Sequence, residues 1–228
     1  MKKLILFLAF CFSANLFAAE PDMLTGDKKT ACEVLLCLSS GTRPSECNAP
    51  LAKFFSIKFK KPWKTLQARR DFLKLCPTDT GNTAEDLVMS DYKEILANSE
   101  DPNQCTPPYL NQQLQSGTYN YDDSLYNKNL SDKIGVRINP NIPSFCYALI
   151  NHQYTDLKMP KYSCSSEFYS QTDWQNGYKL EQISKNSFDN LPNDQRYSYS
   201  YDCTGSHGYK SCTYYFQKIF INKTCWSY

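Results

Sequence analysis

The stretch ACEVLLCLSSGTRPSECNAPLAKFF, residues 31–55, places three cysteines among leucines and aromatic residues. Its first half carries apolar side chains at the i, i+3, i+4 and i+7 positions of one helical face, namely Ala31, Val34, Leu35 and Leu38. Gly41 and Pro44 then break the pattern, because glycine commonly ends a helix and proline interrupts one. The stretch therefore predicts a short helix, a turn and the beginning of a second helix.

Two further helices are predicted in the N-terminal region. The second helix runs from about residue 49 to residue 61, and its apolar positions are Leu51, Phe54, Phe55 and Phe59. The third runs from about residue 63 to residue 75, and its inward positions are Leu66, Phe72 and Leu73. Helices of this length bury little apolar surface, so cross-links are expected to supply the stability that the core lacks.

The cysteines of this region supply such cross-links. Cys32 and Cys37 lie five positions apart, about 140° around a helix, so they cannot bond to each other without breaking it. We expect one disulfide between Cys37 and Cys47, across the turn. We expect another between Cys32 and Cys76, which lies at the end of the third helix.

The N-terminus has the pattern of a secretory signal peptide over residues 1–19. Two lysines precede an apolar run, and Ala18 and Ala19 follow it. The run is too short for a membrane anchor, which needs about 20 apolar residues to span a bilayer. We therefore expect an exported protein that does not span the membrane after cleavage.

Export would place the remaining cysteines in an oxidising compartment. Of the eleven cysteines, only Cys11 lies in the signal segment. The other ten are expected to form disulfides: Cys32, Cys37, Cys47, Cys76, Cys105, Cys146, Cys164, Cys203, Cys212 and Cys225. The sequence has no Cys-x-x-Cys pair and only two histidines, His152 and His207, so neither a metal site nor a cofactor is expected.

Charge is balanced overall but unevenly spread. Removing Lys2 and Lys3 from the 25 basic residues leaves 23, against 23 acidic ones, which argues against wholesale binding to nucleic acid or membrane surfaces. Residues 53–74 hold eight basic residues and one acid, whereas residues 79–101 hold seven acids and one lysine. Three interpretations stay open: the runs pair as neighbouring helices, both are solvated faces, or the basic run steers an acidic partner.

The second half of the chain differs in composition. Residues 99–123 are rich in proline and polar residues and are predicted to form a linker pinned by Cys105. Residues 124–228 are predicted to form a tyrosine-rich domain, with strands around residues 134–138 and 178–182 and a helix over residues 143–154. The predicted fold class is α+β: a small disulfide-linked helical domain over residues 24–98, followed by a tyrosine-rich α/β region that ends in a β-hairpin.

The segment YSYSYDCTGSHGYKSCTYYFQKIFI, residues 197–221, predicts that terminal hairpin. Two glycines turn the chain, so Cys203 and Cys212 flank the turn and are placed to bridge it, while Cys164 is placed to reach Cys225.

Aromatic side chains of the second half admit two interpretations. Three tyrosines share one face of the hairpin: Tyr197, Tyr199 and Tyr201. They form either a binding face, for glycan rings or another protein, or a buried face of the hairpin. The tryptophans are expected to anchor the core: Trp63, Trp174 and Trp226.

The sequence shows no recognised catalytic motif. His152 and Asp156 lie four positions apart in the predicted helix and would suit a base and its orienting carboxylate, although a capping or solvated histidine is the commoner case. Glu33 or Glu46 as the acid of a glycosidase is a further alternative, but nothing in the sequence sets the separation of two carboxylates. We therefore expect a non-enzymatic protein without catalytic residues.

The opening stretch, together with LQARRDFLKLCP at residues 66–77, resembles the TrbM family of bacterial conjugal-transfer proteins. The resemblance covers about residues 24–98 and rests on the Ala31-Cys32-Glu33, Leu36-Cys37-Leu38-Ser39, Gly41-x-Arg43-Pro44-x-Glu46-Cys47 and Leu75-Cys76-Pro77 motifs. It implies a periplasmic accessory of plasmid transfer, associated with a type IV secretion apparatus.

The resemblance also implies roles and partners. Arg43, Pro44 and Glu46 are expected to shape the turn, with Arg43 paired to Glu46 or Glu33 so that it orients Cys47. The expected partners are envelope or type IV secretion components, with peptidoglycan as an alternative ligand and no direct nucleic-acid partner. Alternative functions are a peptidoglycan-acting hydrolase and an envelope-acting toxin or exclusion factor.

Overall fold

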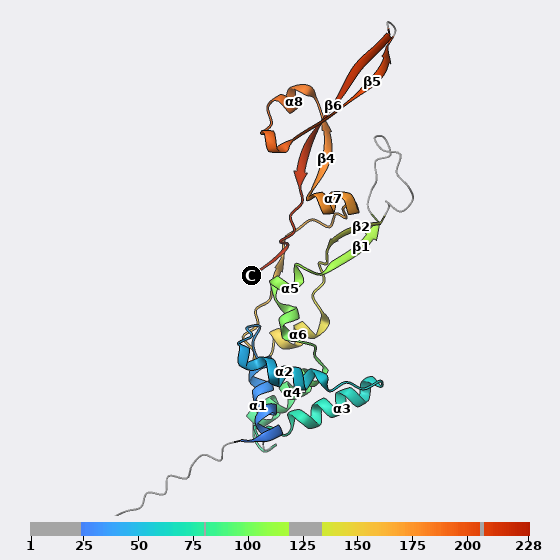
Figure 1. The fold of residues 1–228 in the computed structure, drawn as a ribbon. Helices are drawn as coiled ribbons and strands as arrows, with labels where there is room; N and C mark the ends of the chain where they lie inside the picture. Colours follow the sequence, from blue (N-terminus) through green and yellow to red (C-terminus); the bar gives the residue numbers. More distant parts are fainter. Residues whose placement is uncertain (1–23, 80, 119–133, 206–207) are drawn as a thin grey trace, which may run out of the picture.

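The computed structural model describes residues 24–79, 81–118, 134–205 and 208–228. The predicted signal peptide, part of the predicted linker and His207 therefore lie outside the described residues. Figure 1 shows an elongated molecule with a helical base at one end and a β-hairpin at the other. The fold class is α+β, with helices and small antiparallel sheets.

Four helices form the base: α1 (Gly26–Leu38), α2 (Asn48–Ser56), α3 (Pro62–Leu73) and α4 (Ala84–Asn98). The apolar stripe predicted for α1 is buried, with Val34 and Leu38 almost fully enclosed. Phe54 of α2, Leu73 of α3 and Leu96 of α4 join them in one apolar core. The three helices with predicted apolar faces each bury at least one of the residues predicted for that face.

The basic α3 and the acidic α4 pack against each other, which confirms the interpretation that the two charge runs meet as neighbouring helices. The Arg70 guanidinium donates hydrogen bonds to the carboxylate of Glu94, and this interaction holds the pKa of Glu94 below its usual range. Lys93 is buried on the inner side of α4, where its ammonium group donates to the Cys76 carbonyl at 2.8 Å and to Asp79.

The connection between α2 and α3 differs from the sequence prediction. α2 ends at Ser56, so Phe59 lies in an exposed connection and not on a helix. Because Pro62 favours an extended residue before it, Lys61 is extended and α3 starts at the proline. Trp63 stands on the first turn of α3 and is 62% exposed, so the prediction that it anchors the core is wrong.

Residues 99–118, the described part of the predicted linker, carry regular structure. They form two short helices and a strand: η2 (Pro102–Cys105), α5 (Pro107–Leu110) and β1 (Leu114–Thr118). A proline starts each helix, which is the position that proline favours. β1 pairs antiparallel with the predicted strand β2 (Ile134–Ile138).

A second apolar core lies above the base. It includes Cys105, Ile138 and Trp226, and the burial of Trp226 agrees with its predicted role as an anchor. Helix α6 (Ser144–Ile150) contributes Cys146 to this core and Leu149 to the core of the base. One short helix therefore connects the two cores.

α6 is shorter than predicted, and side chains bond to the backbone in its last turn and just beyond it. The Thr155 hydroxyl donates to the Leu149 carbonyl at 2.6 Å, and the Tyr154 N–H donates to Nδ1 of His152 at 3.2 Å. The helix therefore ends at Ile150, and the residues that follow form turns.

Three antiparallel strands form the distal sheet in the order β4-β6-β5: β4 (Tyr178–Ile183), β6 (Gly208–Phe220) and β5 (Arg196–Gly205). Below it, β3 (Lys161–Tyr162) pairs with β7 (Trp226–Ser227). The remaining short helices are η1 (Ser45–Cys47), α7 (Gln171–Asn176), α8 (Lys185–Asp189) and η4 (Asn193–Gln195). β5 and β6 are the arms of the predicted hairpin.

The ten cysteines form five disulfides, Cys32–Cys76, Cys37–Cys47, Cys105–Cys146, Cys164–Cys225 and Cys203–Cys212. Four of these are the pairs expected from the sequence. The fifth, Cys105–Cys146, was not assigned from the sequence, and it ties η2 to α6.

Loss of the Cys32–Cys76 disulfide should destabilise the helical base. The bond closes a loop with a sequence separation of 44, for which chain entropy predicts a contribution of about 4 kcal/mol. The variant Cys32→Ser/Cys76→Ser should lose about that much free energy of unfolding, measured by urea titration followed by circular dichroism at helical wavelengths. The control Cys203→Ser/Cys212→Ser breaks a bond at the distal hairpin and should leave the helical transition unchanged; equal losses from both variants would contradict this account.

Candidate functional site

The β5–β6 hairpin carries different side chains on its two faces. The strand register places Tyr197 opposite Phe216 and Tyr199 opposite Tyr214. Because opposite residues of antiparallel strands point to the same side, the alternation of tyrosine and serine in β5 puts its tyrosine rings on one face and its serine hydroxyl groups on the other. We call the ring-bearing set the tyrosine face: Tyr197, Tyr199, Tyr201, Tyr214 and Phe216.

The rings of the tyrosine face stack on one another. Between ring centroids, Tyr201 lies 6.0 Å from Tyr199 and 5.4 Å from Tyr214, with interplanar angles of 9° and 15°. The Tyr201 hydroxyl donates to the Tyr214 hydroxyl at 3.2 Å, and this hydrogen bond raises the pKa of Tyr201. Stacking and hydrogen bonding restrict these side chains, so less conformational entropy remains to be lost when they bind a partner.

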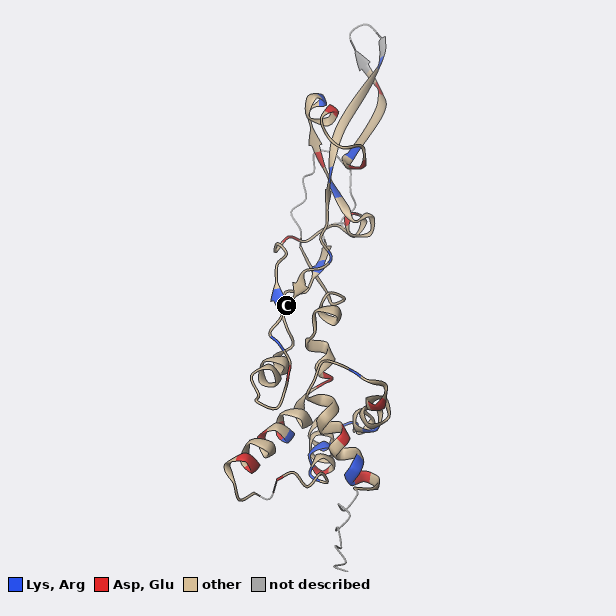
Figure 2. Cartoon of the chain, turned by 90° about the vertical axis from the view of Figure 1, so that its left-hand side faces the viewer, with Lys and Arg blue, Asp and Glu red and all other residues tan. Residues whose placement is uncertain are grey.

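The tyrosine face is open to solvent. Tyr199 is 53% exposed, Tyr197 and Tyr214 are each 36% exposed, and Phe216 alone is buried. The opposite side of the sheet is partly covered by α8, where Phe188 packs against Tyr215 at 4.9 Å between ring centroids. Of the two interpretations of the tyrosine row, the buried face is therefore wrong. Figure 2 shows that uncharged residues make up most of the described hairpin arms.

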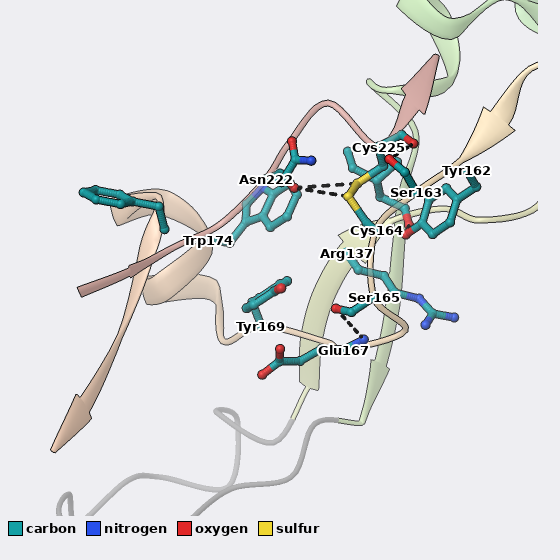
Figure 3. Close-up of a pocket in the computed structure, with 12 residues that line it drawn as sticks. Arg137, Tyr162, Ser163, Cys164, Ser165, Glu167, Tyr169, Trp174, Asn222 and Cys225 are labelled. Carbon is teal, nitrogen blue, oxygen red and sulfur yellow. Dashed lines mark hydrogen bonds between the residues drawn. A yellow bond between two sulfur atoms is a disulfide. The ribbon is translucent and has the colours of Figure 1, made fainter. Parts of the chain in front are cut away.

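A recess of about 240 Å³ lies where the distal sheet joins the middle of the molecule. Figure 3 shows the Cys164–Cys225 disulfide, Trp174 and Tyr169 around it. Trp174, expected to be a core anchor, is only half-buried at this wall. The recess was not found by sequence reasoning, because segments far apart in the chain form it.

The polar groups of the recess bond to their surroundings. Arg137 donates to the Gln115 side chain at 3.0 Å and lies over the ring of Phe168 at 4.2 Å. Glu167 pairs with Lys179 at 2.7 Å. The Arg137 guanidinium points away from the Glu167 carboxylate (Figure 3). We therefore interpret the recess as a structural joint that fastens the distal sheet to the body.

The turn between α1 and η1 is organised by Arg43. Its guanidinium donates to the Cys37 carbonyl at 2.8 Å, to the Ser40 carbonyl, and to the Asp101 carboxylate at 2.5 Å. The expected pairing with Glu46 or Glu33 is wrong. Asp101 comes from the start of η2, and its long separation in sequence explains why no local pattern pointed to it.

Pro44 and Glu46 are the other members of the predicted turn motif. Pro44 is the extended residue just before η1. Glu46 is exposed and accepts a hydrogen bond from the Ser45 hydroxyl at 3.3 Å. Glu33 lies on α1, where its carboxylate is 3.7 Å from the Lys29 ammonium group. The structure therefore places the two candidate glycosidase acids on separate elements, each beside a local partner.

The predicted pair of His152 and Asp156 does not form. His152 lies beyond the end of α6, and its ring stacks on Tyr92 at 4.9 Å between centroids. Asp156 instead accepts a hydrogen bond from the Ser40 hydroxyl at 3.0 Å. Tyr92 is buried, and this burial raises its pKa. His152 is therefore a packing and turn residue of the base.

Within residues 24–79, 81–118, 134–205 and 208–228, no group of three or more histidine, cysteine, aspartate or glutamate side chains is placed to hold a metal ion. Over the same described ranges, no helix has the length and apolar character needed to cross a bilayer.

Arg43 and Asp101 should show energetic coupling. Because the Arg43 side chain is only 17% exposed and its charged hydrogen bond joins the turn to η2, a double-mutant cycle with Arg43→Gln and Asp101→Asn should give a coupling of about 1 kcal/mol or more. Urea unfolding of the four proteins measures it. The exposed pair Lys29 and Glu33 is the control and should couple more weakly; equal couplings would show that the turn does not depend on this contact.

Comparison with known proteins places the chain in a family. A family model described as TrbM matches residues 23–188, which extends past the segment of residues 24–98 that carries the sequence resemblance. The match ends before β5, so the tyrosine face lies outside it. No curated protein and no solved structure matches the chain. Because the family model covers more than half of the sequence, the chain belongs to the TrbM family.

Proposed function

We propose that this protein is a non-enzymatic, periplasmic accessory of conjugal plasmid transfer that docks on an envelope or type IV secretion component. Membership of the TrbM family associates the chain with conjugal transfer. The five disulfides are consistent with a secreted or periplasmic protein, because such bonds persist in oxidising compartments.

The observation that supports docking is the exposed tyrosine face. Tyrosine is enriched at protein interfaces, since its ring contributes apolar contact area and its hydroxyl group hydrogen-bonds at the wet edge. Here neighbouring rings are already stacked, and α8 leaves their side of the sheet uncovered. The matching partner is a protein surface with apolar pockets and with acceptors for phenolic hydroxyl groups.

The rest of the molecule presents this face at a distance from the base. Figure 1 places the hairpin at the opposite end of the long axis from α1–α4. The Cys203–Cys212 disulfide links the two arms, and the Ser200 and Thr213 hydroxyl groups hydrogen-bond across them at 3.0 Å. The hairpin is therefore braced on both faces without help from the helical core.

A mating assay tests the proposal. Deletion of the gene from its plasmid should reduce the number of transconjugants, and the wild-type gene supplied in trans should restore them. Tyr199→Ser/Tyr214→Ser should restore transfer less well, by about tenfold or more, because exposed aromatic anchors contribute much of the binding energy of an interface.

The matched control is Ser198→Ala/Ser211→Ala, which changes the hydroxyl-bearing face of the same strands and should complement fully. Unchanged transfer after deletion, in several recipients, would remove the role in conjugation. Full complementation by the tyrosine variant would remove the docking face. Tyrosine-dependent binding to purified peptidoglycan sacculi, with no protein captured, would reassign the face to a glycan.

A further inference from the structure

The connection between α2 and α3 combines lysines and exposed aromatic rings. We call residues 58–64, with the sequence KFKKPWK, the lysine–aromatic loop. Phe59 is 52% exposed and Trp63 is 62% exposed. Of the three tryptophans, all of which are described, Trp63 alone is exposed. Two large rings therefore face water close together on the helical base.

Four lysines surround these rings: Lys58, Lys60, Lys61 and Lys64. All four are exposed, and residues 57–65 contain no carboxylate. Within the described part of the chain, none of the four takes part in an ion pair. Two other basic residues of the run do form ion pairs, namely Lys53 with Asp27 and Arg70 with Glu94. Four basic residues of the run that form no ion pair within the described chain are thus gathered in this loop.

Hydrogen bonds fix the shape of the loop. The Thr65 hydroxyl accepts a hydrogen bond from the Phe59 N–H at 2.8 Å, and the Arg69 guanidinium donates to the Ile57 carbonyl at 3.3 Å. Arg69 also lies over the rings of Phe54 and Phe55, at 5.2 and 5.5 Å from their centroids. The loop is therefore held on the core while its lysines and two aromatic rings point to solvent. In Figure 1 the connection between α2 and α3 lies at the outer edge of the base.

We propose that the lysine–aromatic loop binds the surface of an anionic phospholipid bilayer. Lysines near such a surface are attracted to lipid phosphates, and their alkyl stems can lie along apolar surface while the ammonium groups stay in water. Tryptophan prefers the headgroup region, and phenylalanine can enter the acyl boundary. The loop lies on the membrane and does not cross it. This inference does not depend on the proposed function, because it uses residues at the other end of the molecule.

Nucleic acid is the other polyanion that lysines and exposed rings can bind. The composition of the loop favours lipid, because residues 58–64 contain no arginine, the residue that pairs with phosphate in a planar fork and stacks on bases.

Sedimentation with vesicles tests the proposal on the chain purified after export. The protein should bind vesicles of phosphatidylcholine mixed with phosphatidylglycerol, and it should bind phosphatidylcholine vesicles much more weakly. Added salt should weaken binding to the anionic vesicles, because it screens the lysines. Tryptophan emission should shift to shorter wavelength on binding, and Trp63→Phe should abolish most of the shift while leaving sedimentation largely intact.

Two variants separate the charge contribution from the aromatic one. Lys60→Gln/Lys61→Gln should weaken binding by about 25-fold, at about fivefold for each lysine. Phe59→Ser/Trp63→Ser should weaken it by about tenfold or more, because the rings no longer enter the headgroup region. The control Lys158→Gln/Lys161→Gln makes the same charge change away from the loop, on residues that are also exposed, and should bind as wild type does.

Several results would overturn the proposal: no binding to anionic vesicles, equal binding to neutral ones, or loop variants that bind as well as wild type. Loop-dependent binding to DNA without binding to vesicles would assign the loop to nucleic acid. Thermal unfolding of each variant verifies that the base is folded. Each of these failures would leave the tyrosine face untouched, since the mating assay changes other residues.

Discussion

Disulfide bonds stabilise a fold that is too elongated to be held by one large apolar core. The described residues bury their apolar side chains in two modest clusters, connected through α6. Three disulfides act where segments distant in sequence meet, with separations of 44, 41 and 61: Cys32–Cys76, Cys105–Cys146 and Cys164–Cys225. Without these bonds the base, the middle and the distal sheet would each depend on a small number of packed residues.

Features that depend on local periodicity could be predicted, and features that depend on distant partners could not. The alternation of tyrosine and serine decided which rings share a face of the hairpin, but whether that face is covered depends on α8. Arg43 was recognised as a turn residue, whereas its partner Asp101 lies on another element. Trp63 was wrongly placed in the core, because a general preference of tryptophan for burial says nothing about an individual connection. Because α6 ends at Ile150, His152 lies beyond the helix and does not pair with Asp156 as predicted.

The two surfaces with proposed roles lie at opposite ends of the molecule (Figure 1). The tyrosine face suits a protein partner, and the lysine–aromatic loop suits an anionic bilayer. The intervening body separates the two surfaces along the long axis of the molecule (Figure 1). The recess beside Cys164–Cys225 belongs to this body and lies at the joint with the distal sheet.

Disulfide mapping of the protein isolated from its host cells, with thiols blocked at the moment of lysis, tests the central claim most directly. Mass spectrometry of peptides prepared without reduction should recover five linked pairs, including Cys105–Cys146, the pair that the sequence did not assign. Cysteines modified by the blocking reagent at most of the ten positions would contradict the account, because an elongated body without cross-links would not hold either surface in place.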